Sequence, residues 1–338
     1  MKKTYTFDDV LLVPQHSSLE SRSEVDMTSH LDERISLKLP VISSPMDTVT
    51  ETAMAVAMHA AGGLGVMHRY NTAEEQASLV QDAFYAGVDN LAAAIGMTGD
   101  YLTRSEELIR AGANILCVDV AHGDHVMMRS CLRELKKNFD VHIMAGNVAT
   151  LDAFERLSDW GADSIRVGIG GGSICSTRIV TGHGVPTLQS VFDISNTSYD
   201  TKIIADGGIK TTGDMVKALA AGADFVMVGS MLAGTRQTPG QVFTDVKGKS
   251  YKAYRGMASA QAQRDWRGKS STPEGVATTI PFRGDVSGLI KDIDGGLRSG
   301  LSYTGARSLD QFRATSKFIV QSQAGQHESN THILWRSQ

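Results

Sequence analysis

"TKIIADGGIKTTGDMVKALAAGADFVMVGS", residues 201–230, contains the unit that decides the fold. Two short apolar runs, KIIAD and DFVMV, flank an amphipathic stretch of helical length, and each run is followed by glycine. Continuously apolar strands that are joined by a helix predict parallel strands covered by helices.

Similar units recur along the chain. The runs LPVISS, GGLGVM, NLAAAIG, NILCVDV, VHIMAG and SIRVG alternate with stretches such as TETAMAVAMHA and TAEEQASLVQDAFYAG. About eight such units fit a (β/α)₈ TIM barrel, which commonly takes roughly 250 residues. A doubly wound sheet is the alternative, but near-equal repeats without a domain break favour the barrel. We therefore expect one α/β domain over residues 1–338, with an N-terminal extension before the first strand.

The segment after the eighth strand differs from these repeats. From about Lys247 to Pro281 the sequence is polar and irregular, and a long irregular insert in a compact domain is commonly a functional loop. We expect an active-site flap there. A closing helix, SLDQFRATSKFI, and a polar tail are expected to follow.

Composition limits the function classes. The chain has 338 residues, 41% hydrophobic and 21% charged, with a net charge of -4, which gives no support for nucleic-acid or membrane binding. Its three cysteines lack CxxC spacing, which argues against a disulfide framework or structural zinc and suits a reducing cytoplasm. The N-terminus lacks the apolar core of a signal peptide, and no apolar run is long enough to span a bilayer.

Polar residues and glycines end the predicted strands, which is where a barrel places its active site. Glycines after the seventh and eighth strands let backbone N–H groups approach a phosphate, and Asp206 could accept both hydroxyls of a ribose. A phosphorylated ligand, specifically a nucleotide, is therefore expected at this mouth. The strand ends are Asp47, His68, Asp119 with His122, Asn147, the Gly170–Cys175 loop, Asp206-Gly207-Gly208 and Gly229-Ser230.

One cysteine stands out. RVGIGGGSICSTR, residues 166–178, follows the sixth strand, so Cys175 is expected to point into the same mouth. Thiolates are nucleophiles, and closely spaced glycine carbonyls could surround a monovalent cation. Cys117 lies in an apolar run and Cys131 in a helix, so both are expected to be structural.

The motifs TFDDVLLVPQHSS, SSPMDTVTE, GNVAT, VGIGGGSICSTR, IADGGIKTTGD and VGSMLAGT closely resemble the IMP dehydrogenase/GMP reductase family over nearly the whole chain. The resemblance implies a (β/α)₈ barrel that binds a purine nucleoside monophosphate. It also implies that the cysteine attacks C2 of the purine, giving a covalent thioimidate called E-XMP*, and that hydride passes between C2 and a nicotinamide.

The resemblance assigns roles by position. Cys175 would be the nucleophile, with Thr177 and Glu274 handling protons. The implied substrate-binding residues are Ser173, Asp206, Gly207, Gly208, Gly229, Ser230, Gly256 and Met257. The implied cofactor-binding residues are Ser21, Arg22, Arg69, Asp119, Val120, Ala121, Ile169, Gly170, Ser302 and Tyr303. The implied potassium ligands are Gly170, Gly172, Cys175 and Arg178.

Two reactions are consistent with this resemblance. GMP reductase converts GMP to IMP with NADPH and releases ammonia, whereas IMP dehydrogenase oxidises IMP with NAD and hydrolyses E-XMP*. SSPMDTVTE, STRIVTG and YRGM are dehydrogenase-like. The Ser21-Arg22 pair, Arg69 and the region TIPFRGDVSGLIKDIDGGLRSGLSYTGA are reductase-like, and the regulatory CBS insert of most dehydrogenases is missing. The flap also lacks the dehydrogenase Arg-Tyr pair, because Asp265 and Trp266 follow Arg264.

The sequence departs from the family at three positions. Gly171 stands where proline is common and should loosen the cation loop, and Ser176 stands where threonine or isoleucine is common. Ser271 stands where a reductase has arginine. On balance we expect a cytoplasmic, homotetrameric GMP reductase that uses NADPH and potassium. The alternatives are an IMP dehydrogenase without the insert, which would use NAD, and a non-catalytic purine-nucleotide-binding protein.

Overall fold

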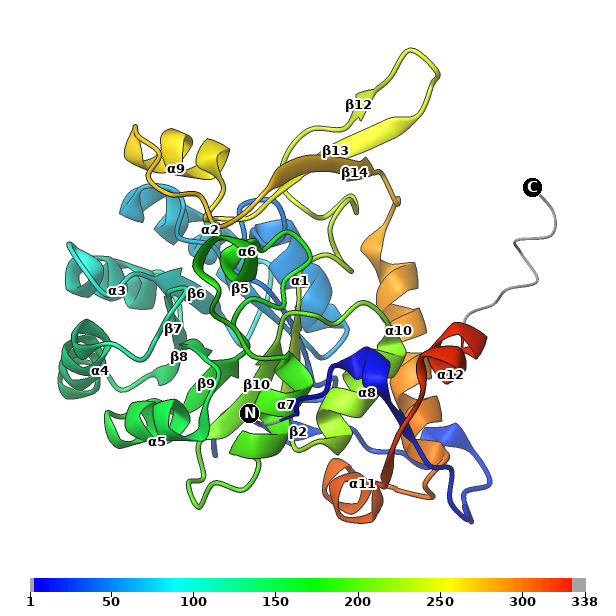
Figure 1. Cartoon of the computed structure of the whole chain (residues 1–338). Coiled ribbons are helices and arrows are strands. Elements are labelled where there is room, and N and C mark those ends of the chain that lie inside the picture. The colour runs from blue at the N-terminus through cyan, green and yellow to red at the C-terminus, as the bar shows by residue number, and fades with distance from the viewer. Residues whose placement is uncertain (1–2, 330–338) are drawn as a thin grey trace.

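An eight-stranded parallel barrel forms the body of the molecule (Figure 1). The computed structural model describes residues 3–329. The barrel strands follow one another around the ring in chain order, and β11 closes the ring by pairing with β4. They are β4 (Val41–Ser43), β5 (Leu64–Met67), β6 (Ala92–Ile95), β7 (Ile115–Asp119), β8 (His142–Val148), β9 (Ser164–Val167), β10 (Lys202–Asp206) and β11 (Phe225–Val228). Each apolar run noted above lies on one of these strands, so the expected (β/α)₈ barrel is confirmed.

Helices surround the barrel and bury its outer face. The expected helices at residues 50–60, 72–87 and 211–223 are confirmed as α1 (Thr52–Ala60), α2 (Ala73–Tyr85) and α8 (Thr212–Ala220). The others around the barrel are α3 (Tyr101–Arg110), α4 (Val126–Asn138), α5 (Leu151–Asp159), α7 (Thr187–Ile194) and α10 (Val286–Ser302). The short helix α6 (Thr177–Thr181) buries none of its residues and lies instead at the C-terminal end of the barrel. In the part of the chain that the structure describes, no helix is long and apolar enough to cross a membrane.

Two apolar clusters hold the barrel together. One lies between the strands and the helices, and the other fills the barrel interior with residues such as Ile42, Met144 and Ile204. The hairpin of β2 (Ser29–His30) and β3 (Ser36–Leu37) adds Leu31 and Leu37 to the interior cluster at the end where the strands begin. Burying each such side chain contributes roughly 1.5–3 kcal/mol. The barrel is therefore plugged at its N-terminal end, and its C-terminal end is left for the site.

The flap is an ordered substructure above that open end (Figure 1). Strands β12 (Phe243–Thr244), β13 (Ser250–Arg255) and β14 (Ala277–Pro281) form an antiparallel sheet, and α9 (Ala260–Arg267) lies between β13 and β14. The sequence predicts a flap of irregular structure from about Lys247, whereas the structure shows a regular sheet there that begins earlier, at Phe243. Its strands lie outside the barrel core, so their polar residues gave no apolar pattern.

The two ends of the described chain meet. Short β1 (Val10–Leu12), after the turn η1 (Phe7–Asp9), pairs antiparallel with β15 (Phe318–Val320). The expected closing helix is shorter than SLDQFRATSKFI, because α11 (Leu309–Thr315) ends before Lys317 and the chain becomes β15. Helix α12 (Gln323–Glu328) follows, and residues 330–338 of the expected polar tail lie outside the described residues.

Candidate active site

A cleft of about 690 Å³ opens at the C-terminal ends of the barrel strands, beneath the flap. All residues assigned above to catalysis, substrate and potassium line it, as do six of the ten assigned to the cofactor. These six are Arg69, Asp119, Val120, Ala121, Ile169 and Gly170. The barrel thus brings together residues that are more than two hundred positions apart in the chain.

Cys175 lies at the end of the glycine loop, two residues before the start of α6, and is half-buried in the cleft wall. Its N–H donates to the Gly172 carbonyl over 3.1 Å. Its Sγ lies 3.2 Å from Oγ1 of Thr177, the first residue of α6. The thiol is therefore within reach of both a hydroxyl partner and any ligand in the cleft. Burial raises the pKa of Cys117 and Cys131 to about 12, which fits their expected structural role.

The flap is hydrogen-bonded directly to the cysteine loop. The Ser176 N–H donates to the Glu274 carbonyl over 2.9 Å, and the Val276 N–H donates to the Ile174 carbonyl over 2.9 Å. Glu274 lines the same cleft as Cys175. These backbone bonds place a carboxylate, a hydroxyl and a thiol around one volume, which is an arrangement suited to covalent chemistry with proton transfer.

The wall of the cleft beside Cys175 is made of backbone. Gly168 has φ +149°, and a Cβ there would lie 1.8 Å from the Asp206 carbonyl oxygen. Gly207 has φ +89°, and a Cβ there would lie 3.2 Å from the Gly172 nitrogen. Glycine is therefore needed for the loops after β9 and β10 to pack against each other. Such close backbone packing makes this wall of the cleft from main chain rather than side chains.

Tyr254 closes this wall from the flap. It is buried on β13, and its hydroxyl lies 3.3 Å from the Ser173 Oγ. Burial raises the pKa of Tyr254, so the phenol stays protonated and can donate a hydrogen bond. Sequence reasoning assigned no role to this residue, although its place as the first residue of the YRGM motif was a usable signal.

A buried arginine links two of the predicted carboxylates. Arg166 Nη2 lies 2.9 Å from Asp206 Oδ2, and its Nη1 lies 2.5 Å from Asp119 Oδ1. Asn147 Nδ2 donates to the same Asp206 oxygen over 2.9 Å. Burial by itself would lower the Arg166 pKa, but Asp206 and Asp119 raise it well above its usual value. No role was assigned to Arg166 from the sequence, although a single charged residue within the apolar run SIRVG could have indicated a buried ion pair.

The opposite side of the cleft is made of side chains. Arg69 Nη2 donates to the Asp119 carbonyl over 3.1 Å, and the Arg69 guanidinium lies 5.2 Å from the Tyr70 ring centroid. The Arg69 Nε is buried and has no hydrogen-bond partner among the described residues. The same Nε lies 3.9 Å from Asp119 Oδ2, which is within ion-pair distance but too long for a hydrogen bond. A buried donor without a hydrogen bond costs free energy, so this nitrogen fits a site that is completed by an acceptor on a ligand.

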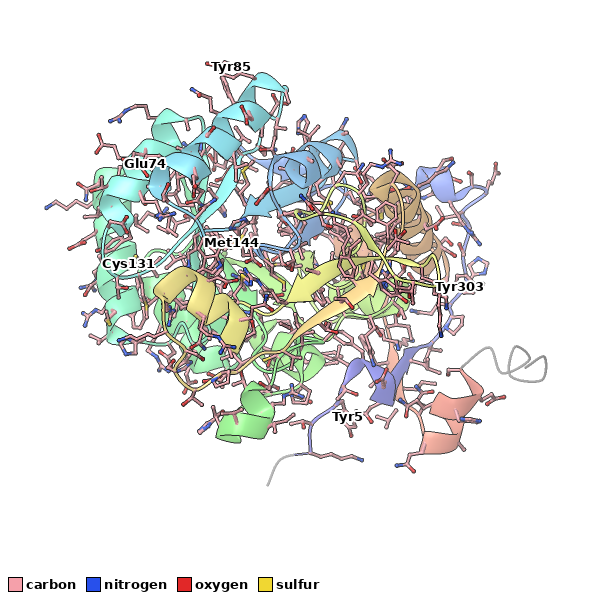
Figure 2. The ribbon with its side chains drawn as sticks, turned by 90° about the horizontal axis from the view of Figure 1, so that it is seen from above. Tyr5, Glu74, Tyr85, Cys131, Met144 and Tyr303 are labelled. Atoms are coloured by element: carbon pink, nitrogen blue, oxygen red, sulfur yellow. The ribbon has the colours of Figure 1, made fainter. Side chains whose placement is uncertain are left out.

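Four predicted cofactor residues lie elsewhere. Ser21 and Arg22 are exposed at η2 (Arg22–Glu24), which packs on α10, and Ser302 and Tyr303 lie at the end of that helix. Tyr303 is 59% exposed, and Figure 2 shows it at the periphery, away from Met144 in the barrel interior. These four residues do not line the cleft of their own chain.

The predicted potassium ligands offer neutral carbonyl oxygens, which is the chemistry of a monovalent-cation site. The Gly172 carbonyl accepts the Cys175 N–H, and the Arg178 carbonyl accepts the Gly182 N–H, each over 3.1 Å. Both oxygens retain a second lone pair. The described residues contain no group of three or more His, Cys, Asp or Glu side chains that could hold a metal ion. The chemistry of these carbonyl donors is thus compatible with potassium.

Several further lining residues have no counterpart in the sequence-based assignment. Residues 6–8 and Lys210 line one end of the cleft, where Lys210 Nζ lies 2.7 Å from the Asp8 carboxylate. Gln263 and Arg267 reach it from α9. Arg264, the flap arginine that the sequence pointed to, does not line it.

Residues 4–332 match the model of the IMP dehydrogenase / GMP reductase domain. The chain is 35% identical to an inosine-5′-monophosphate dehydrogenase of Nitrosopumilus maritimus, with 98% of each chain covered. It is 31% identical to a GMP reductase of Leishmania major, with 97% of this chain and 96% of the relative covered. A cysteine-to-alanine variant of the GMP reductase of Trypanosoma brucei, solved in complex with guanosine 5′-monophosphate, superposes with a TM-score of 0.92 at 29% identity, with 98% of each chain covered.

Proposed function

Because the chain belongs to the IMP dehydrogenase / GMP reductase family of oxidoreductases, we propose that it reduces GMP to IMP with NADPH and releases ammonia. The observation that carries this proposal is the Cys175–Thr177 contact of 3.2 Å, with Glu274 in the same cleft. A nucleophile, a hydroxyl and a carboxylate suit covalent attack at C2 with proton transfer, which both family reactions use, and the flap distinguishes between the two.

The thiolate of Cys175 attacks C2 of guanine, and the C2–N bond breaks as the amine leaves as ammonia. Glu274, acting with Thr177, delivers the proton that the leaving amine needs. The product of this step is the thioimidate E-XMP*. NADPH, when bound, supplies a hydride to C2, and the C2–S bond then breaks to give IMP and restore the thiolate. The net reaction is GMP + NADPH + H⁺ → IMP + NADP⁺ + NH₃.

The backbone wall of the cleft would hold the nucleotide. Gly208, Gly229 and Ser230 present strand-end N–H groups to its phosphate, and Asp206 accepts the ribose hydroxyls. The hydrogen bonds from Arg166 and Asn147 fix the Asp206 carboxylate, which orients it before the ligand arrives. Ser173, Gly207, Gly256 and Met257 complete this site.

The nicotinamide half of the cofactor would lie beside Asp119. The Arg69 Nε, which lacks a hydrogen-bond partner, supports an anionic ligand there, and Val120, Ala121, Ile169 and Gly170 form the neighbouring wall. Ser21, Arg22, Ser302 and Tyr303 would serve the cleft of a neighbouring subunit in a homotetramer, because they lie on the outer surface of their own chain. Potassium would bind the carbonyls of Gly170, Gly172, Cys175 and Arg178 and stiffen the cysteine loop.

The flap favours reductase over dehydrogenase chemistry. Arg264 has no hydrogen-bond or ion-pair partner for its side chain within residues 3–329 and does not line the cleft. Asp265 pairs with Arg255, and the Trp266 indole donates to Asp47, so neither replaces a tyrosine that activates water. IMP dehydrogenase remains the second candidate, because the relative from Nitrosopumilus maritimus is named as one.

An absorbance assay at 340 nm with two reaction mixtures tests the proposal. Purified protein with potassium receives either GMP and NADPH or IMP and NAD. We expect NADPH loss with matching ammonia release in the first mixture and no NADH in the second. NADH in the second mixture alone would establish the dehydrogenase instead.

Glu274→Gln tests the assigned proton transfer. The variant should lose about 10²–10⁴-fold in ammonia release, which is the usual size of general acid–base help. GMP affinity should stay within about twofold, because the glutamate is not assigned to nucleotide binding. Full ammonia release by the variant would remove Glu274 from the mechanism.

A further inference from the structure

Arg267, the last residue of α9, presents an unpaired guanidinium to the cleft. No hydrogen bond or ion pair engages this side chain within the described residues 3–329. The nearby carboxylates already have partners: Asp47 and Asp265 bind Arg255, and Asp119 binds Arg166. The positive charge of Arg267 is therefore available to a ligand.

Arg267 lies on the same side of the cleft as Arg69. The ring centroids of Trp266 and Tyr70 are 6.2 Å apart. The Arg69 guanidinium stacks over the Tyr70 ring, 5.2 Å from its centroid. Arg267 is also close enough to lower the pKa of the Tyr70 phenol, against a larger rise caused by burial. Tyr70 thus has one guanidinium on its ring and contacts the residue before Arg267, and the Arg69 guanidinium has a buried nitrogen without a hydrogen-bond partner.

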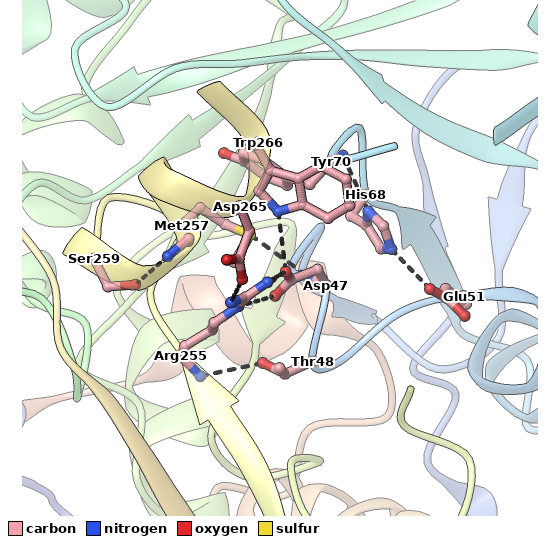
Figure 3. Close-up of polar contacts among 11 residues, drawn as sticks. Asp47, Thr48, Glu51, His68, Tyr70, Arg255, Met257, Ser259, Asp265 and Trp266 are labelled. Carbon is pink, nitrogen blue, oxygen red and sulfur yellow. Dashed lines mark hydrogen bonds and ion pairs between the residues drawn. The ribbon is translucent and has the colours of Figure 1, made fainter. Parts of the chain in front are cut away.

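A network anchored at Asp47 holds the last turn of α9 in this position (Figure 3). The Asp47 side chain is 6% exposed and accepts from Arg255 Nη2 over 2.6 Å and from Trp266 Nε1 over 3.2 Å. Arg255 also pairs with Asp265, the residue before Trp266. Since Asp47 follows β4, the network ties the flap helix to the barrel and fixes where Arg267 emerges.

We propose that Arg267, together with Arg69, binds the pyrophosphate of the nicotinamide dinucleotide. This inference rests on the proposed function, which places the nicotinamide ribose at Asp119, next to Arg69. The pyrophosphate is joined directly to that ribose, so it must lie close by. Guanidinium groups suit phosphate because their planar N–H donors form paired, charge-assisted bonds.

Ser271 lines the cleft beside α9, and its N–H and Oγ donate to Gln263 Oε1 over 2.8 and 3.1 Å. Ser271 contributes no charge, so the positive charge at this part of the cleft comes from Arg267, four residues earlier. The phosphate of the substrate is a less suitable partner, because the proposed function places it at the glycines that follow β10 and β11, whereas Arg267 belongs with Tyr70 and Arg69, which follow β5.

Equilibrium titrations with NADPH and with NADH, followed by the fluorescence of the bound dinucleotide, test the proposal on the full chain. The variants are Arg267→Gln and a matched control, Arg264→Gln, from the same helix but outside the cleft. Arg267→Gln should weaken both dinucleotides about tenfold, as expected for one charge-assisted hydrogen bond. Arg264→Gln should bind like wild type, and GMP affinity, measured by calorimetry, should be the same in all three proteins.

The outcomes separate this inference from the function on which it rests. Equal dinucleotide affinity of Arg267→Gln and Arg264→Gln would overturn the role of Arg267 but leave the proposed function standing. A loss confined to NADPH would overturn the pyrophosphate assignment in favour of the 2′-phosphate, and a loss confined to GMP would move Arg267 to the substrate. If wild type binds neither dinucleotide, the proposed function fails and the inference with it.

Discussion

The cleft has two halves that are built differently. The glycine half consists of the Gly168–Cys175 loop, Gly207-Gly208 and Gly229-Ser230, and its inward-facing groups are mostly backbone. The arginine half consists of Arg69, Tyr70, Asp119 and Arg267, with Trp266 packed behind Tyr70. Its contacts are made by side chains from the ends of β5 and β7 and from the flap. Arg166 joins the halves by pairing with Asp119 on one side and Asp206 on the other.

This difference indicates how each half achieves specificity. A backbone wall is fixed by the barrel itself and cannot change without changing the fold, which suits a constant ligand part such as a phosphate. A side-chain wall depends on where the flap helix rests, so it can change with single substitutions. We therefore expect substrate binding to depend on the barrel and cofactor binding to depend on the flap.

The largest expected effect is a difference in reactivity between Cys175 in the cleft and the two buried cysteines. Burial raises the pKa of Cys117 and Cys131 to about 12, so on the order of 10⁻⁴ of each thiol is ionised at pH 8. Iodoacetamide at pH 8 should therefore modify Cys175 alone in the folded protein, and peptide mass spectrometry can identify the site. Alkylation of Cys117 at a similar rate would mean that the interior opens.

Arg166→Gln should remove the ion pairs that join the two halves and so destabilise the fold. It leaves two carboxylates without their buried partner, and breaking such a pair commonly costs about 3–5 kcal/mol of unfolding free energy. Urea denaturation measures this loss. Arg34→Gln is the control, because Arg34 and Asp140 form an exposed pair worth about 1 kcal/mol or less. Equal losses for both variants would show that the Arg166 network does not stabilise the fold.

Gly168→Ala tests the glycine half alone. The new Cβ would meet the Asp206 carbonyl in a backbone conformation that side chains rarely adopt. We expect a loss of about 1–3 kcal/mol in unfolding free energy together with weaker GMP binding. Gly295→Ala, within α10 and with open space around it, should be neutral or slightly stabilising. Unchanged GMP affinity in Gly168→Ala would contradict the need for close backbone packing.

Trp266→Phe tests the arginine half with a smaller change. It keeps the ring against Tyr70 but removes the indole N–H that binds Asp47. Loss of one hydrogen bond to a charged group, worth about 1.5 kcal/mol, should raise the population in which the end of α9 is detached from Asp47 by roughly tenfold. We therefore expect the KM for the cofactor to rise about three- to fivefold, while kcat is maintained. Trp160→Phe, at the end of α5, serves as control. A change in GMP KM instead would link α9 to the glycine half.

The sequence indicates most of the glycine half but only Arg69 and Asp119 of the arginine half, for a physical reason. Glycines at strand ends and the Cys175 loop leave local signals, because the barrel itself brings strand ends together. Trp266 and Arg267 acquire their place only when Asp47, more than two hundred residues earlier, binds the flap helix. No local pattern encodes that contact, so Arg264 was the arginine that the flap sequence indicated. The role of Arg166 could not be predicted for the same reason, because its partners lie on two other strands, β7 and β10.

The most direct test of the account is the covalent state of Cys175 during turnover. Wild type and Cys175→Ala are mixed with GMP and NADPH, or with IMP and NAD, quenched in acid, digested and analysed by mass spectrometry. The account predicts a nucleotide adduct on the peptide that contains Cys175, absent from the variant, which should still bind GMP. A wild-type protein that turns over nucleotide with no adduct, or that binds nucleotide without any turnover, would contradict it.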